Sequence, residues 1–93
     1  MSDLPVTDVT GGAAPAGGKG DPELDARIIP HAIRHGAVIG AFSQVRQGKA
    51  MVLIAPHNPL PLLGQLADIE GDALEVTYLQ QGPDVWRLRL ART

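Results

Sequence analysis

The uninterrupted apolar segment from Ala50 to Ala55 constrains the fold of this chain more than any other feature. It lies between Lys49 and Pro56, is too short to form a helix of its own, and is rich in residues that favour strands. A strand that is apolar at every position is buried on both faces and needs a neighbouring strand on each side. We therefore expect this segment to be the central strand of a sheet.

Two amphipathic helices are predicted around this strand. Pro30 opens the first, which covers about residues 30–47, and Gly48 stands at the position of a C-terminal cap. Asn58 is expected to cap the second helix, because Pro59 disfavours a helical conformation at its predecessor and itself fits a first helical turn. Gly71 ends that helix. The apolar stripes consist of Ile33, Ala37, Val38, Ala41, Phe42 and Val45 in the first helix, and Leu62, Leu63, Leu66 and Ile69 in the second.

Three further strands complete the pattern. The alternating segment 23–27 is typical of a short edge strand, whereas 73–79 and 85–92 form a hairpin around a turn at 80–84. The predicted cross-strand pairs are Leu79 with Val85, Tyr78 with Trp86, Val76 with Leu88, Leu74 with Leu90, and Glu75 with Arg89. Right-handed crossovers then place both helices on one side of a mixed four-stranded sheet. The fold class is a two-layer α/β sandwich with the order βαβαββ.

One face of such a sheet has no helix over it. The central strand carries apolar residues there, either Met51 and Leu53 or Val52 and Ile54, and Leu79 and Val85 extend the patch. An exposed apolar patch marks a partner surface or a self-association surface. The alternative is that the charged side chains Arg87, Arg89 and Glu75 screen it.

Composition limits the function classes. Residues 1–21 are mostly Gly, Ala, Pro, Thr and Asp and are expected to be a disordered tail, which leaves a single domain at 22–93. The formal net charge of -2 has no basic block, so nucleic acid is not an expected partner. With no cysteine and no long apolar run, we expect no disulfide, no thiolate chemistry and no membrane span, and a cytoplasmic location.

The three histidines lie where a predicted strand is followed by a predicted helix. His31 and His35 are separated by one helical turn, a spacing used by metal-binding helices, and His57 belongs to the second such passage. If the first two strands are parallel, both passages lie at the same end of the sheet, where ligands of open α/β sheets bind. Three imidazoles predict a transition-metal site, and an imidazole can also ligate haem.

Two alternatives remain open at this end of the fold. Arg27, Arg34 and the two helix N-termini would favour a phosphate or a carboxylate, with Asn58 beside them. A histidine in a first helical turn can also be a solvated residue with no ligand. Catalysis has little support, because Ser43 lies well inside the first helix and no other nucleophile is near a histidine. We expect a binding protein and not an enzyme.

Several short segments together resemble a family of small bacterial domains of unknown function related to the TusA/SirA-like sulfur-carrier fold. They are Leu24–Arg27, Ile29–His31, Arg34–His35, a variant His-Asp-Pro-x-Pro-Leu motif at His57–Leu62, and Gln81–Leu88. The resemblance covers about residues 22–92 and implies the two-layer βαβαββ sandwich with strand order 1-2-4-3. It also implies an accessory role that involves a metal, a haem or a redox reaction. The partners it implies are haemerythrin-like or other redox proteins.

Two departures from that family's patterns bear on function. Sulfur carriers of the TusA type use a cysteine in a Cys-Pro turn, where this chain has Ile29 before Pro30, so the resemblance carries no sulfur transfer. Asn58 stands where members that resemble this chain have aspartate, and it lacks the charge that would orient His57 or bind a metal.

Overall fold

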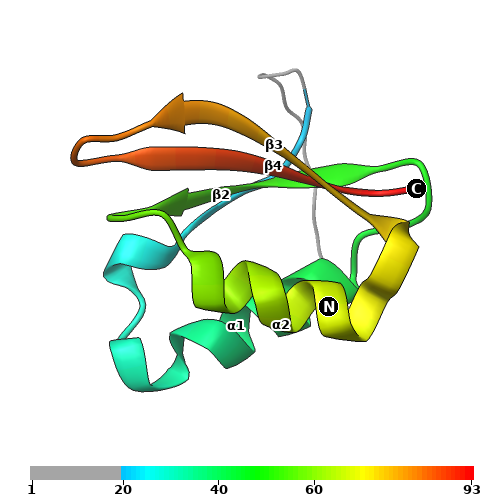
Figure 1. The fold of residues 1–93 in the computed structure, drawn as a ribbon, viewed down its shortest axis with the longest axis horizontal. Coiled ribbons are helices and arrows are strands. Elements are labelled where there is room, and N and C mark those ends of the chain that lie inside the picture. The colour runs from blue at the N-terminus through cyan, green and yellow to red at the C-terminus, as the bar shows by residue number, and fades with distance from the viewer. Residues whose placement is uncertain (1–19) are drawn as a thin grey trace, which may run out of the picture.

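The apolar strand β2 (Ala50–Ala55) lies inside a four-stranded sheet, as its sequence predicts. The computed structural model describes residues 20–93, and two helices cover one face of the sheet (Figure 1). The strand order is β1-β2-β4-β3, with β1 and β2 parallel and the other pairs antiparallel. The remaining elements are β1 (Glu23–Asp25), the 3-10 helix η3 (Ala26–Ile28), α1 (His31–Ser43), α2 (Leu60–Glu70), the 3-10 helix η4 (Gly71–Ala73), β3 (Leu74–Gln81) and β4 (Trp86–Arg92). The predicted fold class and strand order are confirmed.

The hydrophobic core lies between the sheet and the helices. Met51 and Leu53 of β2 belong to it, so these residues occupy the helix-facing side of the central strand. Leu88 and Leu90 of β4 are fully buried in the same layer. The helices contribute Val38, Phe42, Leu62 and Leu66. Every one of these helical residues belongs to the apolar stripes that the spacing predicts. Two other members of those stripes are not buried as expected: Ile33, in the first turn of α1, is 60% exposed, and Ile69, in the last turn of α2, is 59% exposed.

Val52 and Ile54 occupy the outer face of β2, yet they are only 7% and 5% exposed. Ion pairs between arginines of β4 and acidic residues in or just before β1 cross this face, because β2 lies between those two strands. These pairs are Arg87 with Glu23 at 3.3 Å and Arg89 with Asp21 at 2.9 Å. The aliphatic stems of the arginines shield the apolar residues beneath them. Of the two alternatives for this face, screening by charged residues fits the structure, although Leu79 at the sheet edge is 53% exposed.

The end of α1 and the end of β1 both differ from the prediction. Helix α1 ends at Ser43 and not near residue 47, because Arg92 of β4 donates to the carbonyl oxygens of Phe42 and Val45. Gly48 therefore does not cap the helix but forms the turn into β2, with a φ of 82° that favours glycine. Strand β1 is also shorter than predicted, because the Asp25 side chain caps η3 directly after it.

The hairpin register is the main error of the sequence analysis. Tyr78 lies opposite Leu88 and not Trp86, and the other predicted pairs are displaced in the same direction. The observed pairs are Leu74 with Arg92, Glu75 with Ala91, Val76 with Leu90, Thr77 with Arg89, Gln80 with Arg87, and Gln81 with Trp86. An irregularity between Tyr78 and Gln80 accompanies the continuation of β3 to Gln81, two residues into the predicted turn. A displacement by two positions keeps each side chain on its predicted face, so the core is unchanged.

The predicted tail of residues 1–21 lies outside the described residues except for its last two positions, of which Asp21 pairs with Arg89. None of the described helices has the length and apolar character needed to cross a membrane.

Candidate functional site

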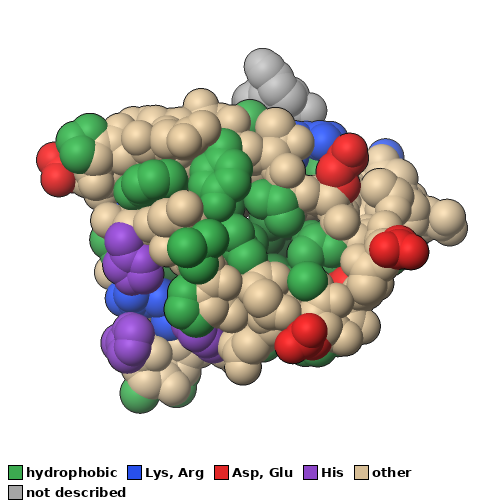
Figure 2. Space-filling view, in the orientation of Figure 1, with side chains coloured by type: hydrophobic (Ala, Val, Ile, Leu, Met, Phe, Trp, Pro, Cys, Tyr) green, Lys and Arg blue, Asp and Glu red, His purple; other side chains and the backbone are tan. Residues whose placement is uncertain are grey.

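All three histidines border one small pocket at the end of the sheet where β1 and β2 finish. His31 is the first residue of α1, His35 follows one turn later, and His57 lies in the loop between β2 and α2. The pocket has a volume of about 210 Å³. Figure 2 shows the purple histidine side chains gathered at this end of the molecule, next to cationic side chains. Because β1 and β2 are parallel, both strand-to-helix passages lie at this end of the sheet.

Two of the imidazoles are oriented by hydrogen bonds from one ring nitrogen. His35 Nδ1 lies 2.8 Å from Oε1 of Gln65 on α2, and His57 Nδ1 lies 3.3 Å from the carbonyl oxygen of Asn58. An amide or carbonyl oxygen accepts a hydrogen bond, so each of these contacts forms in the tautomer that carries its proton on Nδ1. The Nε2 atom of each neutral ring is then left with its lone pair. Gln65 has no motif around it that would have revealed this role in the sequence.

Arg34 also lines the pocket and is held in place by the backbone. Its Nε and Nη2 atoms donate to the carbonyl oxygen of Ile29, over 3.1 and 2.9 Å. No aspartate or glutamate is among the described residues that line the pocket. The fixed positive charge of Arg34 is therefore not neutralised inside the pocket by the described part of the chain.

Arg27, a predicted ligand-binding residue, does not line this pocket. It forms an exposed ion pair with Asp25 at 2.8 Å, and its backbone N–H donates to the same carboxylate. The side-chain hydrogen bond from Arg27 lowers the pKa of Asp25 from its ordinary 3.8 to about 2. The same contact raises the pKa of Arg27. Arg27 thus serves a local ion pair at the start of η3.

Asn58 has a different role from the predicted cap. Helix α2 takes Pro59 as its N-cap and has no side-chain cap hydrogen bond. The side-chain oxygen of Asn58 accepts a hydrogen bond from the Tyr78 hydroxyl at 2.7 Å. This contact ties the loop that carries His57 to strand β3. Asn58 itself is not among the residues that line the pocket.

The N-termini of both main helices are at this end without side-chain caps. The N-cap of α1 is Pro30 and that of α2 is Pro59, and neither can accept a hydrogen bond through its side chain. Helix N-termini carry unpaired N–H groups and a partial positive charge. The pocket therefore has a positive electrostatic character from the backbone as well as from Arg34.

A three-imidazole metal centre is not assembled in this arrangement. Within residues 20–93, no group of three or more His, Cys, Asp or Glu side chains is close enough to hold one metal ion. The histidines share a pocket without converging on a common point. A metal held here would have at most two of these imidazoles as protein ligands.

The fold and this pocket define a small two-layer α/β domain with a histidine-bordered pocket at the carboxyl ends of its parallel strands. A family model described as an uncharacterized conserved protein (DUF2249) matches residues 23–92, and the chain belongs to this family. Comparisons with curated proteins and with solved structures give no match.

Proposed function

We propose that this protein is a non-enzymatic binding domain whose histidine pocket takes a small oxyanion, such as phosphate or the carboxylate of a small molecule. The observation that carries the proposal is the lining of the pocket. Arg34 and three histidines face it, and none of the described lining residues is acidic.

The backbone supports the same ligand class. Two helix N-termini without side-chain caps flank the pocket, and such N-termini favour anions. The pocket volume of about 210 Å³ is below the roughly 300–1,000 Å³ typical of sites for drug-sized ligands. An ion or a single functional group fits this size better than a large molecule.

The proposal is tested by adding inorganic phosphate to the full chain and following backbone amide and histidine ring NMR signals. We expect saturable shifts at His31, His35 and His57 and at the amides of the first turns of α1 and α2. R34Q should weaken binding about tenfold, since it removes a charge-assisted contact.

R27Q is the matched control, because it removes the same charge from an arginine just outside the pocket. Equal losses in R34Q and R27Q would mean that phosphate responds only to net charge, and the proposal would fail. Shifts that grow linearly with phosphate and never saturate would have the same meaning.

A transition metal or haem is the second candidate. His35 and His57 both place an oxygen acceptor on Nδ1, the arrangement that usually orients a metal-binding histidine and leaves Nε2 for the metal. The resemblance to small bacterial domains related to the TusA/SirA-like fold, some of which are associated with redox proteins, also supports a metal or haem ligand. On this proposal the partners would be haemerythrin-like or other redox proteins in the cytoplasm. A metal would supply Lewis acidity or redox chemistry, and a haem would be held by one of these imidazoles.

Variants of the pocket residues separate the two candidates. Metal binding competes with protons for the imidazole nitrogens, so zinc or copper should bind more tightly at pH 8 than at pH 5.5. H35Q and H57Q should each abolish the zinc-induced shifts at the other ring, whereas H31Q should leave them unchanged. Haem added to the chain should show an absorbance change that the same variants remove. Zinc binding that survives H35Q and H57Q would exclude this pocket as the metal site.

A protein partner is supported by a different observation from the predicted one. The outer sheet face is screened, but large apolar side chains are exposed near the histidine pocket. Ile28, Ile33 and Leu60 are 81%, 60% and 61% exposed, and they belong to the same two passages as the histidines. A partner that covers this rim would bury them together with the pocket. Chemical-shift mapping with a candidate redox partner should then affect this end of the molecule and not the outer sheet face.

A further inference from the structure

A second and larger pocket lies at the opposite end of the same strands. It has a volume of about 510 Å³ and is lined by residues at the beginnings of β1 and β2 and at the end of α1. The histidine pocket is lined by the ends of those strands and the beginning of that helix, so the two pockets share no lining residue and lie towards opposite ends of the strands. The volume is within the roughly 300–1,000 Å³ typical of pockets for small molecules.

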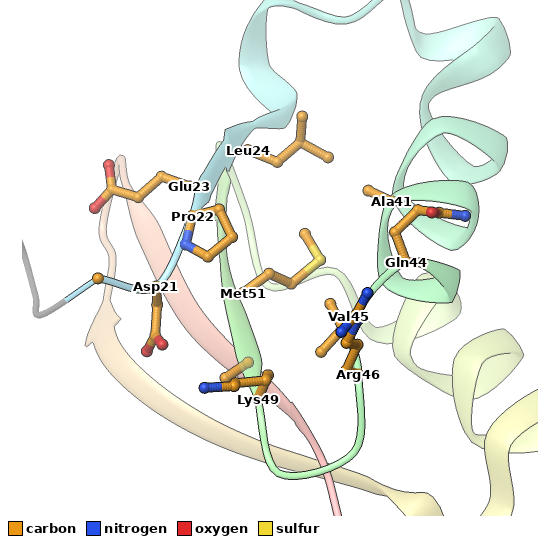
Figure 3. Close-up of a pocket in the computed structure, with 12 residues that line it drawn as sticks. Asp21, Pro22, Glu23, Leu24, Ala41, Gln44, Val45, Arg46, Lys49 and Met51 are labelled. Carbon is orange, nitrogen blue, oxygen red and sulfur yellow. The ribbon is translucent and has the colours of Figure 1, made fainter. Parts of the chain in front are cut away.

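The interior of this second pocket is apolar. Leu24 of β1 and Met51 of β2 face Ala41 of α1 and Val45 just beyond the helix, and these side chains border a common gap (Figure 3). The gap exists because the helix presents only a methyl group at Ala41, opposite the edge strand. Burial of apolar surface against these residues would be the main source of affinity for a ligand.

The charges around the opening are unequal. Both acidic lining residues are paired with arginines of β4, Asp21 with Arg89 and Glu23 with Arg87. The two cationic lining residues, Arg46 and Lys49, form no ion pair with any residue in the described range 20–93. Two positive charges at the opening are therefore left without a described counter-charge.

The end of α1 does not oppose an anion here. A helix C-terminus normally carries a partial negative charge on its unpaired carbonyl groups. In this protein, Arg92 donates to the carbonyl oxygens of Phe42 and Val45, so these two carbonyl groups are not left unpaired, and Arg92 is itself paired with Glu70. Arg46 and Lys49 are therefore the lining residues whose positive charge is left to attract an anion.

We propose that this pocket binds a small amphipathic anion, a molecule with an apolar body and one carboxylate. The apolar body lies between Leu24, Ala41 and Met51, and the carboxylate lies at the opening beside Arg46 and Lys49. This site is independent of the histidine pocket and of its proposed ligand.

The test uses octanoate as the probe and 1-octanol as its neutral counterpart, each added to the isotopically labelled full chain. Octanoate should produce saturable shifts of the Leu24, Val45 and Met51 methyl signals, with no shift of the histidine rings. R46Q/K49Q should weaken octanoate binding about tenfold, the combined effect of two exposed charge contacts, and leave 1-octanol binding unchanged. A41L adds a side chain to the gap and should abolish the shifts with both probes, while the thermal unfolding curve shows that the domain is still folded.

Several results would overturn the proposal. Equal affinity for octanoate and 1-octanol would remove the role of the two cations. Equal octanoate affinity in R46Q/K49Q and in the original chain would have the same consequence. This variant changes only residues at the opening and leaves the hydrophobic core intact. Contacts between residues 1–19 and Met51 in the chain without probe would identify the chain's own N-terminal segment as the occupant. If A41L unfolds, V45F fills the same gap from the loop, and retention of octanoate binding in a folded V45F would place the ligand elsewhere.

Discussion

Arg92 is expected to be the most important polar side chain for the stability of this fold. It is the last residue of β4, and its Nε and Nη2 atoms donate to the carbonyl oxygens of Val45 and Phe42, over 2.6 and 3.0 Å. Its Nη1 atom donates to a carboxylate oxygen of Glu70 at 2.6 Å, and its guanidinium carbon lies 4.5 Å from the centre of the Phe42 ring. One side chain thus joins the sheet to the ends of both helices.

The expected cost of R92M follows from these contacts. The side chains of Arg92 and Glu70 are 20% and 15% exposed, so the pair is shielded from solvent more than a surface ion pair. Each hydrogen bond to a charged group contributes on the order of 1.5–3 kcal/mol when it is buried, but water reaches the carbonyl groups once the side chain is shortened. We therefore expect R92M to lower the free energy of unfolding by about 3 kcal/mol, of which the uncompensated Glu70 carboxylate accounts for roughly 1 kcal/mol. For a domain of this size, that loss lowers the Tm by roughly 12–24 °C.

Urea unfolding followed by the fluorescence of Trp86, the only tryptophan, measures this free energy. E70Q is the control, because it removes the carboxylate charge and keeps the contacts of Arg92 with α1, and it should cost about 1 kcal/mol. R92K should lie between R92M and the original chain, since an ammonium cannot serve three acceptors in this geometry. A cost below 1 kcal/mol for R92M, or equal costs for E70Q and R92M, would refute the assignment of Arg92 as the link between the layers.

The contact with Arg27 lowers the pKa of Asp25 to about 2 in the folded protein, so the ion pair stabilises the fold above about pH 4 and loses this effect as the pH falls towards 2. Thermal unfolding of the original chain and of D25N should therefore show a stability difference at pH 4 and above that disappears as the pH is lowered to 2. Y78F removes the hydrogen bond to Asn58 and should cost about 1 kcal/mol in urea unfolding, with faster amide exchange in the loop before α2 and unchanged exchange in β4. G82A should cost about 1–3 kcal/mol, because Gly82 has a φ of 65° and a methyl group there would lie 3.0 Å from an indole carbon. G64A, where a methyl group meets no atom within 4 Å, should instead stabilise α2 in the same assay.

The features that sequence reasoning predicted correctly are those with local causes. The apolar run at Ala50–Ala55 predicts its own strand without error, and every helical residue buried in the core comes from a predicted stripe, although Ile33 and Ile69 of those stripes are exposed. Gly71 ends α2 as predicted, with a positive φ of 58°. Each of these outcomes depends on a few consecutive residues and on the helical or strand period alone.

The errors come from contacts between residues far apart in the chain. Nothing near residue 44 indicates that α1 stops there, because the group that binds its last carbonyls is supplied by Arg92. The hairpin register depends on an irregularity after Tyr78 that alternation alone cannot locate, since displacement by two positions leaves the pattern of faces intact. Asn58 fits the rules for a cap, but the hydroxyl of Tyr78 binds its side chain instead.

The candidate site shows the same division between local and distant causes. Parallel pairing of β1 and β2 was sufficient to bring His57 to the end of the sheet that carries His31 and His35, because topology determines which end of a strand a loop occupies. Topology does not determine the direction of a side chain, and the partner that orients His35 is Gln65, thirty positions away. The directions of the side chains, and not the topology, decide whether three imidazoles form one set of metal ligands or line one cationic pocket. The ring-orienting contacts and the absence of a described acidic lining residue therefore tell more about ligand class here than the spacing of the histidines does.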